Sequence, residues 1–166
     1  VRNFPDLMNY FSSSVNPKEF RAAKRNIPED MATLLYLIGE DKLYIFVATI
    51  DSVYARVIDV DVRELENDIH DLHALLTRPS FTSTDKIELR GAATLEFSDD
   101  VPDNKIVFNL LSEKLYSLLI VPVLHEIADK EKLVIIPNGV LYYLPFQVLG
   151  YNDPDGSKEY LIEEYE

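Results

Sequence analysis

Short apolar runs separated by turn residues dominate residues 31–59. Met31–Ile38, residues 42–50 and Val53–Asp59 each have the length and composition of a β-strand. The two connections between them are short and polar, which favours antiparallel neighbours and predicts a meander. Every position from 43 to 48 is apolar, so we expect the middle strand to be buried on both faces.

Two longer segments have helical periodicity. In residues 62–78, apolar side chains recur every three or four positions, Asp61 precedes them as an N-cap, and Pro79 ends the run. The apolar positions of this first helix are Leu65, Ile69, Leu72 and Leu76. Residues 108–130 predict a second helix, interrupted or restarted at Pro122.

Weaker patterns predict a short helix over residues 17–25, with Pro17 at its first position, and a short strand near residues 93–97. Residues 1–26 are interpreted as an irregular or short-helical lead-in, and residues 27–166 as one domain. This domain combines predicted strands and helices, and the predicted class is α/β, with a mixed β-sheet flanked by helices.

The most informative stretch is residues 132–149. Residues 133–136 are apolar without alternation and predict an interior strand covered on both faces. Pro137-Asn138-Gly139 predicts a tight turn, and the apolar run after it predicts a second short strand that ends at Phe146. After a turn-rich loop over residues 150–158, residues 160–165 predict a strand whose glutamates protect an open sheet edge.

Charge and cysteine content restrict the partners. The chain of 166 residues has a net charge of −13, which disfavours nucleic acid and anionic membranes, because both are bound through clustered Lys and Arg. Apolar runs such as residues 43–50 are too short to cross a bilayer, and no signal peptide is visible. The absence of cysteine excludes disulfides and thiolate metal sites in this chain. Proteins or peptides remain as the expected partners.

The three histidines give little support for a metal or catalytic site. His70 and His73 lie three residues apart on the predicted helix, with Glu66 nearby, which is a possible metal geometry without the further ligands that it needs. Two polar residues beside the apolar stripe are the preferred interpretation. His125 is interpreted as a favourable cation at a helix end.

Other polar groups and glycines also have plain interpretations. The acidic pairs lack the spacing of a calcium loop and are interpreted as solvent-exposed surface charges. Tyr142-Tyr143 is interpreted as a pair of side chains that pack in a strand. No phosphate-binding loop surrounds Gly91 or Gly139. We therefore predict no catalytic residue, cofactor site or metal site in this chain. The acidic groups considered are Asp99-Asp100, Glu163-Glu164 and the turn at Asp153-Pro154-Asp155-Gly156.

Residues 132–149 also resemble the signature of the CHAT domain, a caspase-like module often found with tetratricopeptide repeats. The family pattern has an apolar strand, Pro-Asp-Gly, a spaced Leu, then Leu-Pro-Phe and a later Leu. The chain departs from it only at Asn138, where the family usually has Asp, and both residues suit a turn. Weaker resemblances at residues 34–48, 115–122 and 159–165 extend the likeness from about Ile27 to the C-terminus. The matching positions are Pro137, Gly139, Leu141, Leu144, Pro145, Phe146 and Leu149.

The resemblance implies a cysteine peptidase whose His and Cys follow two later strands. This chain has no cysteine, and its last histidine, His125, precedes the signature. Since it also begins at Val1 and stops within a strand-like run, we expect the scaffold half of a cytoplasmic CHAT-type peptidase domain, without the catalytic pair. The remaining half of the domain is then one expected partner, and self-association through an open sheet edge is another. The alternative is a non-catalytic interaction or regulatory domain.

Overall fold

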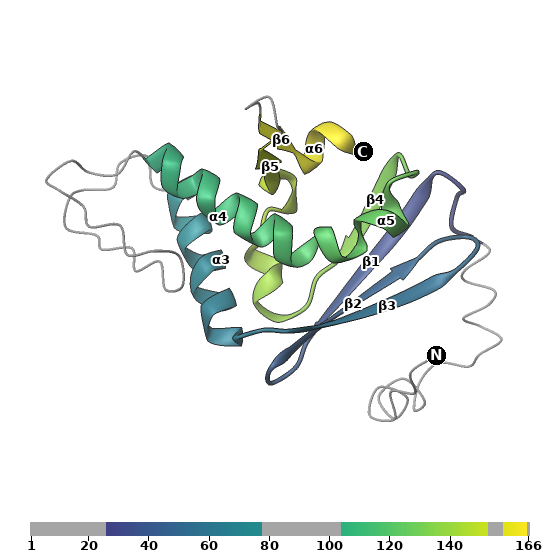
Figure 1. Cartoon of the computed structure of the whole chain (residues 1–166), viewed down its shortest axis with the longest axis horizontal. Coiled ribbons are helices and arrows are strands. Elements are labelled where there is room, and N and C mark those ends of the chain that lie inside the picture. The colour runs from purple at the N-terminus through teal and green to yellow at the C-terminus, as the bar shows by residue number, and fades with distance from the viewer. Residues whose placement is uncertain (1–25, 78–103, 153–157, 166) are drawn as a thin grey trace, which may run out of the picture.

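The computed structural model describes residues 26–77, 104–152 and 158–165 and has the predicted α/β class (Figure 1). Its main sheet has four strands in the order β3-β2-β1-β4. A separate antiparallel pair, β5 (Gly150–Asn152) and β6 (Lys158–Tyr160), packs beside the helix α4. The expected strand near residues 93–97, the helix over 17–25 and the acidic groups at 99–100 and 153–156 lie outside the described residues.

The predicted meander is confirmed. β1 (Met31–Ile38), β2 (Lys42–Ala48) and β3 (Val53–Asp59) pair antiparallel in chain order. β2 ends two residues earlier than predicted, because Thr49 begins the hairpin turn. Its backbone N–H donates to the carbonyl of Ser52 at 2.9 Å, and its hydroxyl accepts from the Ser52 N–H at 3.2 Å.

β4 (Lys132–Ile136) pairs parallel with β1, which makes the sheet mixed. The prediction of an interior strand is wrong for the described chain, where β4 is the last strand of the sheet. Leu133 and Ile135 are partly buried, whereas Val134 and Ile136 are 40% and 44% exposed. A run of apolar residues without alternation thus marks a strand with two apolar faces here, but not one that is covered on both.

The first predicted helix is confirmed as α3 (Val62–Thr77). Asp61 caps it as expected, because its Oδ1 accepts from the backbone N–H groups of Arg63 at 2.9 Å and Glu64 at 3.2 Å. Leu65, Ile69 and Leu72 are buried, while Leu76 at the last turn is exposed.

The second helical segment is divided into α4 (Asn104–Leu119), the 3-10 turn η1 (Val121–Val123) and α5 (Leu124–Ile127). Pro122 lies in the 3-10 turn, so the predicted interruption is confirmed. By length and composition, residues 104–127 would suffice to cross a membrane. In the structure they bury one face in the core, as a core helix does, through residues such as Leu111, Leu115 and Leu119.

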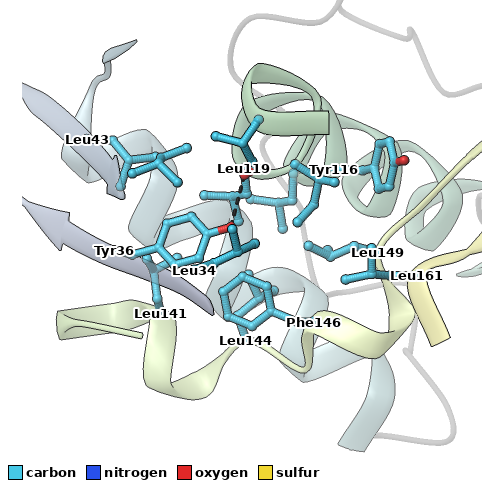
Figure 2. Close-up of a cluster of buried hydrophobic side chains, with 14 of the residues drawn as sticks. Leu34, Tyr36, Leu43, Tyr116, Leu119, Leu141, Leu144, Phe146, Leu149 and Leu161 are labelled. Atoms are coloured by element: carbon cyan, nitrogen blue, oxygen red, sulfur yellow. Dashed lines mark hydrogen bonds between the residues drawn. The ribbon is translucent and has the colours of Figure 1, made fainter. Parts of the chain in front are cut away.

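The hydrophobic core lies between one face of the sheet and the helices (Figures 1 and 2). In the main sheet, the fully buried side chains come from alternate positions of β1 and β2, and all of them point to this face. They are Ala32, Leu34, Tyr36, Leu43, Ile45 and Val47. The other side chains of β2 are only partly buried, so the expectation that β2 is buried on both faces is correct for one face only.

A charged cluster joins the helices α3 and α4. Lys114 of α4 reaches Glu64 at 2.6 Å and Asp68 at 2.7 Å, both from α3. Burial opposes the charge of Lys114, yet hydrogen bonds to these carboxylates raise its pKa. Burial raises the pKa of the Asp68 carboxyl, and the ammonium group of Lys114 offsets part of this rise. The charged form of Asp68 is therefore stabilised by Lys114.

The chain after β4 is mostly helical rather than extended. The predicted second strand is replaced by the 3-10 helices η2 (Gly139–Tyr143) and η3 (Phe146–Val148). Leu141 and Leu144 are buried and three residues apart, which is the 3-10 repeat, whereas Tyr142 and Tyr143 are 69% and 60% exposed. The interpretation of these tyrosines as strand packing is therefore wrong.

The predicted strand over residues 160–165 is also wrong. Only Tyr160 belongs to a strand, and α6 (Leu161–Glu164) follows at once. The carboxylate of Glu163 accepts from the Tyr160 N–H at 2.8 Å, and the Tyr165 N–H donates to the Leu161 carbonyl at 3.2 Å. These bonds close a helical turn that places Leu161 and Tyr165 on one side. Glu163 thus caps the turn instead of protecting a strand edge.

Candidate functional site

The turn after β4 is fixed by two residues of the signature. Asn138 Oδ1 accepts from the backbone N–H of Ile38 at 3.3 Å, which links the turn to the end of β1. A carboxylate oxygen accepts hydrogen bonds in the same way, so Asn preserves the acceptor that an Asp would supply. Gly139 has a φ of +59°, a conformation that other residues adopt only with strain. The predicted tight turn is confirmed.

Phe146 anchors the segment to the sheet. Its ring is 7% exposed and lies 5.4 Å from the ring of Tyr36, measured between centroids. Figure 2 shows both rings in the core, with the Tyr36 hydroxyl donating to the carbonyl of Leu119 at 3.0 Å. Complete burial raises the pKa of this hydroxyl, so it stays protonated and holds β1 to the end of α4.

A shallow groove of about 350 Å³ runs beside β4. It lies between the strand, the Leu144–Phe146 segment and α6, and most of its lining is apolar. Since β4 pairs only with β1 in the described chain, its other edge has backbone groups available for pairing, and its Leu133 and Ile135 line the groove. The lining residues are Leu133, Ile135, Pro137, Leu144, Phe146, Gln147, Leu161, Ile162 and Tyr165. We call this arrangement the β4 groove.

Tyrosines and glutamates of α4, β5, β6 and α6 lie close together near Tyr165, a residue of the β4 groove. The Tyr151 hydroxyl donates to Glu159 Oε2 at 2.8 Å, and its ring lies 5.2 Å from that of Tyr116. Within the described chain, the buried Oε1 of Glu164 has no hydrogen-bond partner. Burial raises the pKa of the Glu164 carboxyl, and the charge of Glu159 adds to this effect, although the Tyr151 hydroxyl offsets part of it. Burial likewise raises the pKa of Tyr165, which also lines the groove.

The structure does not bring the histidines together into a site. His70 and His73 are exposed on α3, and the ring of His70 lies 6.2 Å from that of Tyr143. His125 is exposed in α5, and the described residues contain no group of three potential metal-ligating His, Asp or Glu side chains. Among the described residues, those that line the β4 groove therefore form the strongest candidate site.

The segment that forms the β4 groove was compared with models of known protein families. The family model of the CHAT domain matches residues 110–166. Residues 110–166 are therefore similar to the CHAT domain family. The matched CHAT segment runs from α4 to α6 and supplies every residue that lines the β4 groove. The resemblance of residues 27–109 to the same family stays a prediction. Comparisons with curated proteins and with solved structures give no match.

The CHAT signature residues have distinct structural roles. Asn138 and Gly139 form the turn, Leu141 and Leu144 fill the core, and Phe146 packs on Tyr36. Sequence reasoning found these positions but missed the β4 groove, because its lining comes from three separate segments. The spacing of Leu161 and Tyr165 was the available signal for α6, since four residues separate side chains on one helix face.

Proposed function

We propose that this chain is the scaffold part of a CHAT-type, caspase-like cysteine peptidase domain whose catalytic His and Cys lie outside it. Two observations support the proposal. Residues 110–166 match the CHAT domain, and none of the 166 residues is a cysteine. In this role the chain builds the sheet and positions its open edge, while another polypeptide segment supplies the nucleophile and the base.

The observation that carries the proposal is the β4 groove. β4 already pairs parallel with β1, and its outer edge borders an apolar surface formed by Phe146, Ile162 and Tyr165. A further strand added beside β4 would continue the sheet and cover these side chains. The remaining half of the domain is the proposed occupant.

Partners and location are further parts of this proposal. Proteins or peptides are favoured over nucleic acid and membranes by the net charge of −13. Hydrolase activity of the complete protein, attachment to tetratricopeptide repeats and a cytoplasmic location are proposed from the resemblance alone.

A second candidate is a non-catalytic interaction domain. The same edge of β4 suits an extended peptide from another protein, which would gain backbone hydrogen bonds from the strand and apolar contacts from the groove. The absence of cysteine favours this candidate equally, because binding needs no nucleophile.

The test uses the product of the complete gene and a cysteine-directed peptide probe. Ile162 is 64% exposed and lines the β4 groove, so Ile162→Lys should block docking without disturbing the core. Tyr142→Lys is the matched control, since Tyr142 is 69% exposed and lies outside the groove.

The scaffold proposal expects probe labelling in the wild type and the control, and its loss in Ile162→Lys. No labelling in any form, together with a peptide partner that Ile162→Lys releases, would establish the interaction domain instead. Equal labelling of all three proteins would show that nothing essential docks in the groove.

A further inference from the structure

The side of the main sheet opposite the core is also apolar. The strand registers place residues of all four strands on this side in rows, such as Ile136, Leu35, Phe46 and Ala55. We call this surface the back face. Its large apolar members are Met31, Leu35, Leu37, Tyr44, Phe46, Val53, Val57, Val134 and Ile136.

The back face is less buried than the core face. No back-face side chain of the main sheet is fully buried in the described structure, and Val53, Val57, Val134 and Ile136 are 36–44% exposed. The described helices lie along the other side of the sheet (Figure 1). A sheet with two apolar faces is normally covered on both, so this surface calls for an additional layer.

Charged pairs lie at the two ends of the back face. Lys42 and Asp59, paired across β2 and β3, are joined at 2.5 Å, and Lys132 reaches Asp30 at 2.7 Å at the opposite end of the sheet. An apolar centre with a charged rim is the composition of a surface that another segment covers.

We propose that residues 1–25 of this chain are the segment that covers the back face. They directly precede the described chain, which enters β1 at Met31, so the connection needs no long linker. They contain three of the eight phenylalanines, Phe4, Phe11 and Phe20, together with other large apolar residues. Side chains of this kind need an apolar surface to leave water.

Charge favours the same pairing. Residues 1–25 contain five basic and two acidic residues, a net charge of +3, whereas the whole chain carries −13. The rest of the chain therefore carries −16 and attracts this basic segment. A second copy of the chain would instead bring together two molecules that each carry a net charge of −13.

Residues 1–25 are long enough to cross the back face. The strands of the sheet have 5–8 residues and span at most about 27 Å, at roughly 3.3 Å per residue. A helix over residues 17–25 would extend about 13 Å, at roughly 1.5 Å per residue, and residues 1–16 remain to cross the other strands. The segment can thus span the surface in both directions.

The absence of cysteine makes thiol labelling a clean test, because an introduced cysteine is the single thiol. Val57→Cys and Ile136→Cys report on the back face, and Tyr142→Cys, an exposed position of η2, is the control. Each is labelled with a maleimide in the intact chain and in a chain that also carries Phe11→Asp and Phe20→Asp. A second control replaces Ser12 and Asn16 by Asp, which adds the same charge without removing apolar groups.

The proposal expects the two phenylalanine substitutions to speed labelling of the back-face thiols by roughly tenfold, because the cover opens more often. Tyr142→Cys should be unaffected, and the Ser12→Asp, Asn16→Asp control should have a much smaller effect. Equal rates in both backgrounds would overturn the proposal. Protection that disappears on dilution would overturn it in favour of a second copy.

A spin label at Ser13→Cys keeps the test decisive if the double variant does not fold. In the otherwise unchanged chain, the label should broaden amide resonances of β2 and β3 and spare those of α3. Broadening of neither strand would refute the cover.

Discussion

Phe146 and Tyr36 join the CHAT segment to the sheet, and their rings are both in the core. Phe146→Ala should lower the free energy of unfolding by about 3–5 kcal/mol, because it leaves a cavity against Tyr36. Tyr36→Phe is expected to destabilise the fold less than Phe146→Ala does. It keeps the ring contact, loses the hydrogen bond to Leu119, and should cost about 0.5–1.5 kcal/mol. Urea denaturation measures both, and an unchanged midpoint for Phe146→Ala would show that its ring is not in the core.

Substitutions at the two turn residues Asn138 and Gly139 should differ in their effect on stability. Gly139→Ala should destabilise the fold by about 1–2 kcal/mol, because alanine is strained at a φ of +59°. Asn138→Asp should stay within about 0.5 kcal/mol of the wild type, since either side chain can accept from the Ile38 N–H. Thermal unfolding of the two variants is the measurement. A larger loss for Asn138→Asp than for Gly139→Ala would contradict this account of the turn.

Glu164 should make the stability depend on pH. Its pKa is raised by burial, so the folded chain holds this proton more tightly than the unfolded chain does. Stability from this group therefore rises as the pH falls through the folded pKa toward 4.5, and a penalty remains at neutral pH. Glu164→Gln should raise the unfolding midpoint at pH 7, and the gain should vanish in acid below the unfolded pKa. A gain that is equal at pH 7 and pH 4 would disprove the assignment.

At the scale of elements, the Lys114 cluster holds α3 against α4. Lys114→Met should cost roughly 1–3 kcal/mol, because it leaves Asp68 without its cation in a site where that side chain is 10% exposed. Lys114→Arg keeps the charge and should lose less. Chemical denaturation at pH 7 compares them, and equal losses would show that the shape of lysine matters more than its charge.

Local pattern was enough to predict the meander and both helical segments. Each has its own signal, namely short polar turns for the hairpins, the Asp61 cap for α3 and Pro122 for the interruption after α4. These features depend on contacts between residues that are close in the sequence. The position of β4 depends on its pairing with β1, about a hundred residues earlier, and no local pattern encodes that.

The short elements after β4 escaped prediction for a different reason. An apolar run of five residues fits a strand or a helical turn equally well. Here the buried residues are Leu141 in η2 and Leu144 directly after it, and their three-residue spacing favours the helical turn. Residues 160–165 were predicted as a strand for the same reason, although residues 161–164 form α6. The candidate site could therefore be predicted at its turn but not at its groove, which needs both the edge of β4 and the position of α6.

For the whole molecule, the scaffold proposal predicts that this chain alone hydrolyses no peptide, because it has no cysteine and no histidine after His125. A library of fluorogenic peptides incubated with the purified chain should give only background signal. The contrary result is activity that survives repurification and disappears on a single substitution in this chain.

The parallel pairing of β1 with β4 also sets the order in which the molecule can assemble. Ile38 and Asn138 bond to each other across 100 residues, so β1 leaves the ribosome long before the strand that flanks it. At about 5–20 residues per second, the delay is roughly 5–20 s. During that time the meander exists with β1 as an open apolar edge. Such a long-range pairing slows folding and leaves an apolar edge exposed in the nascent chain, where it favours aggregation.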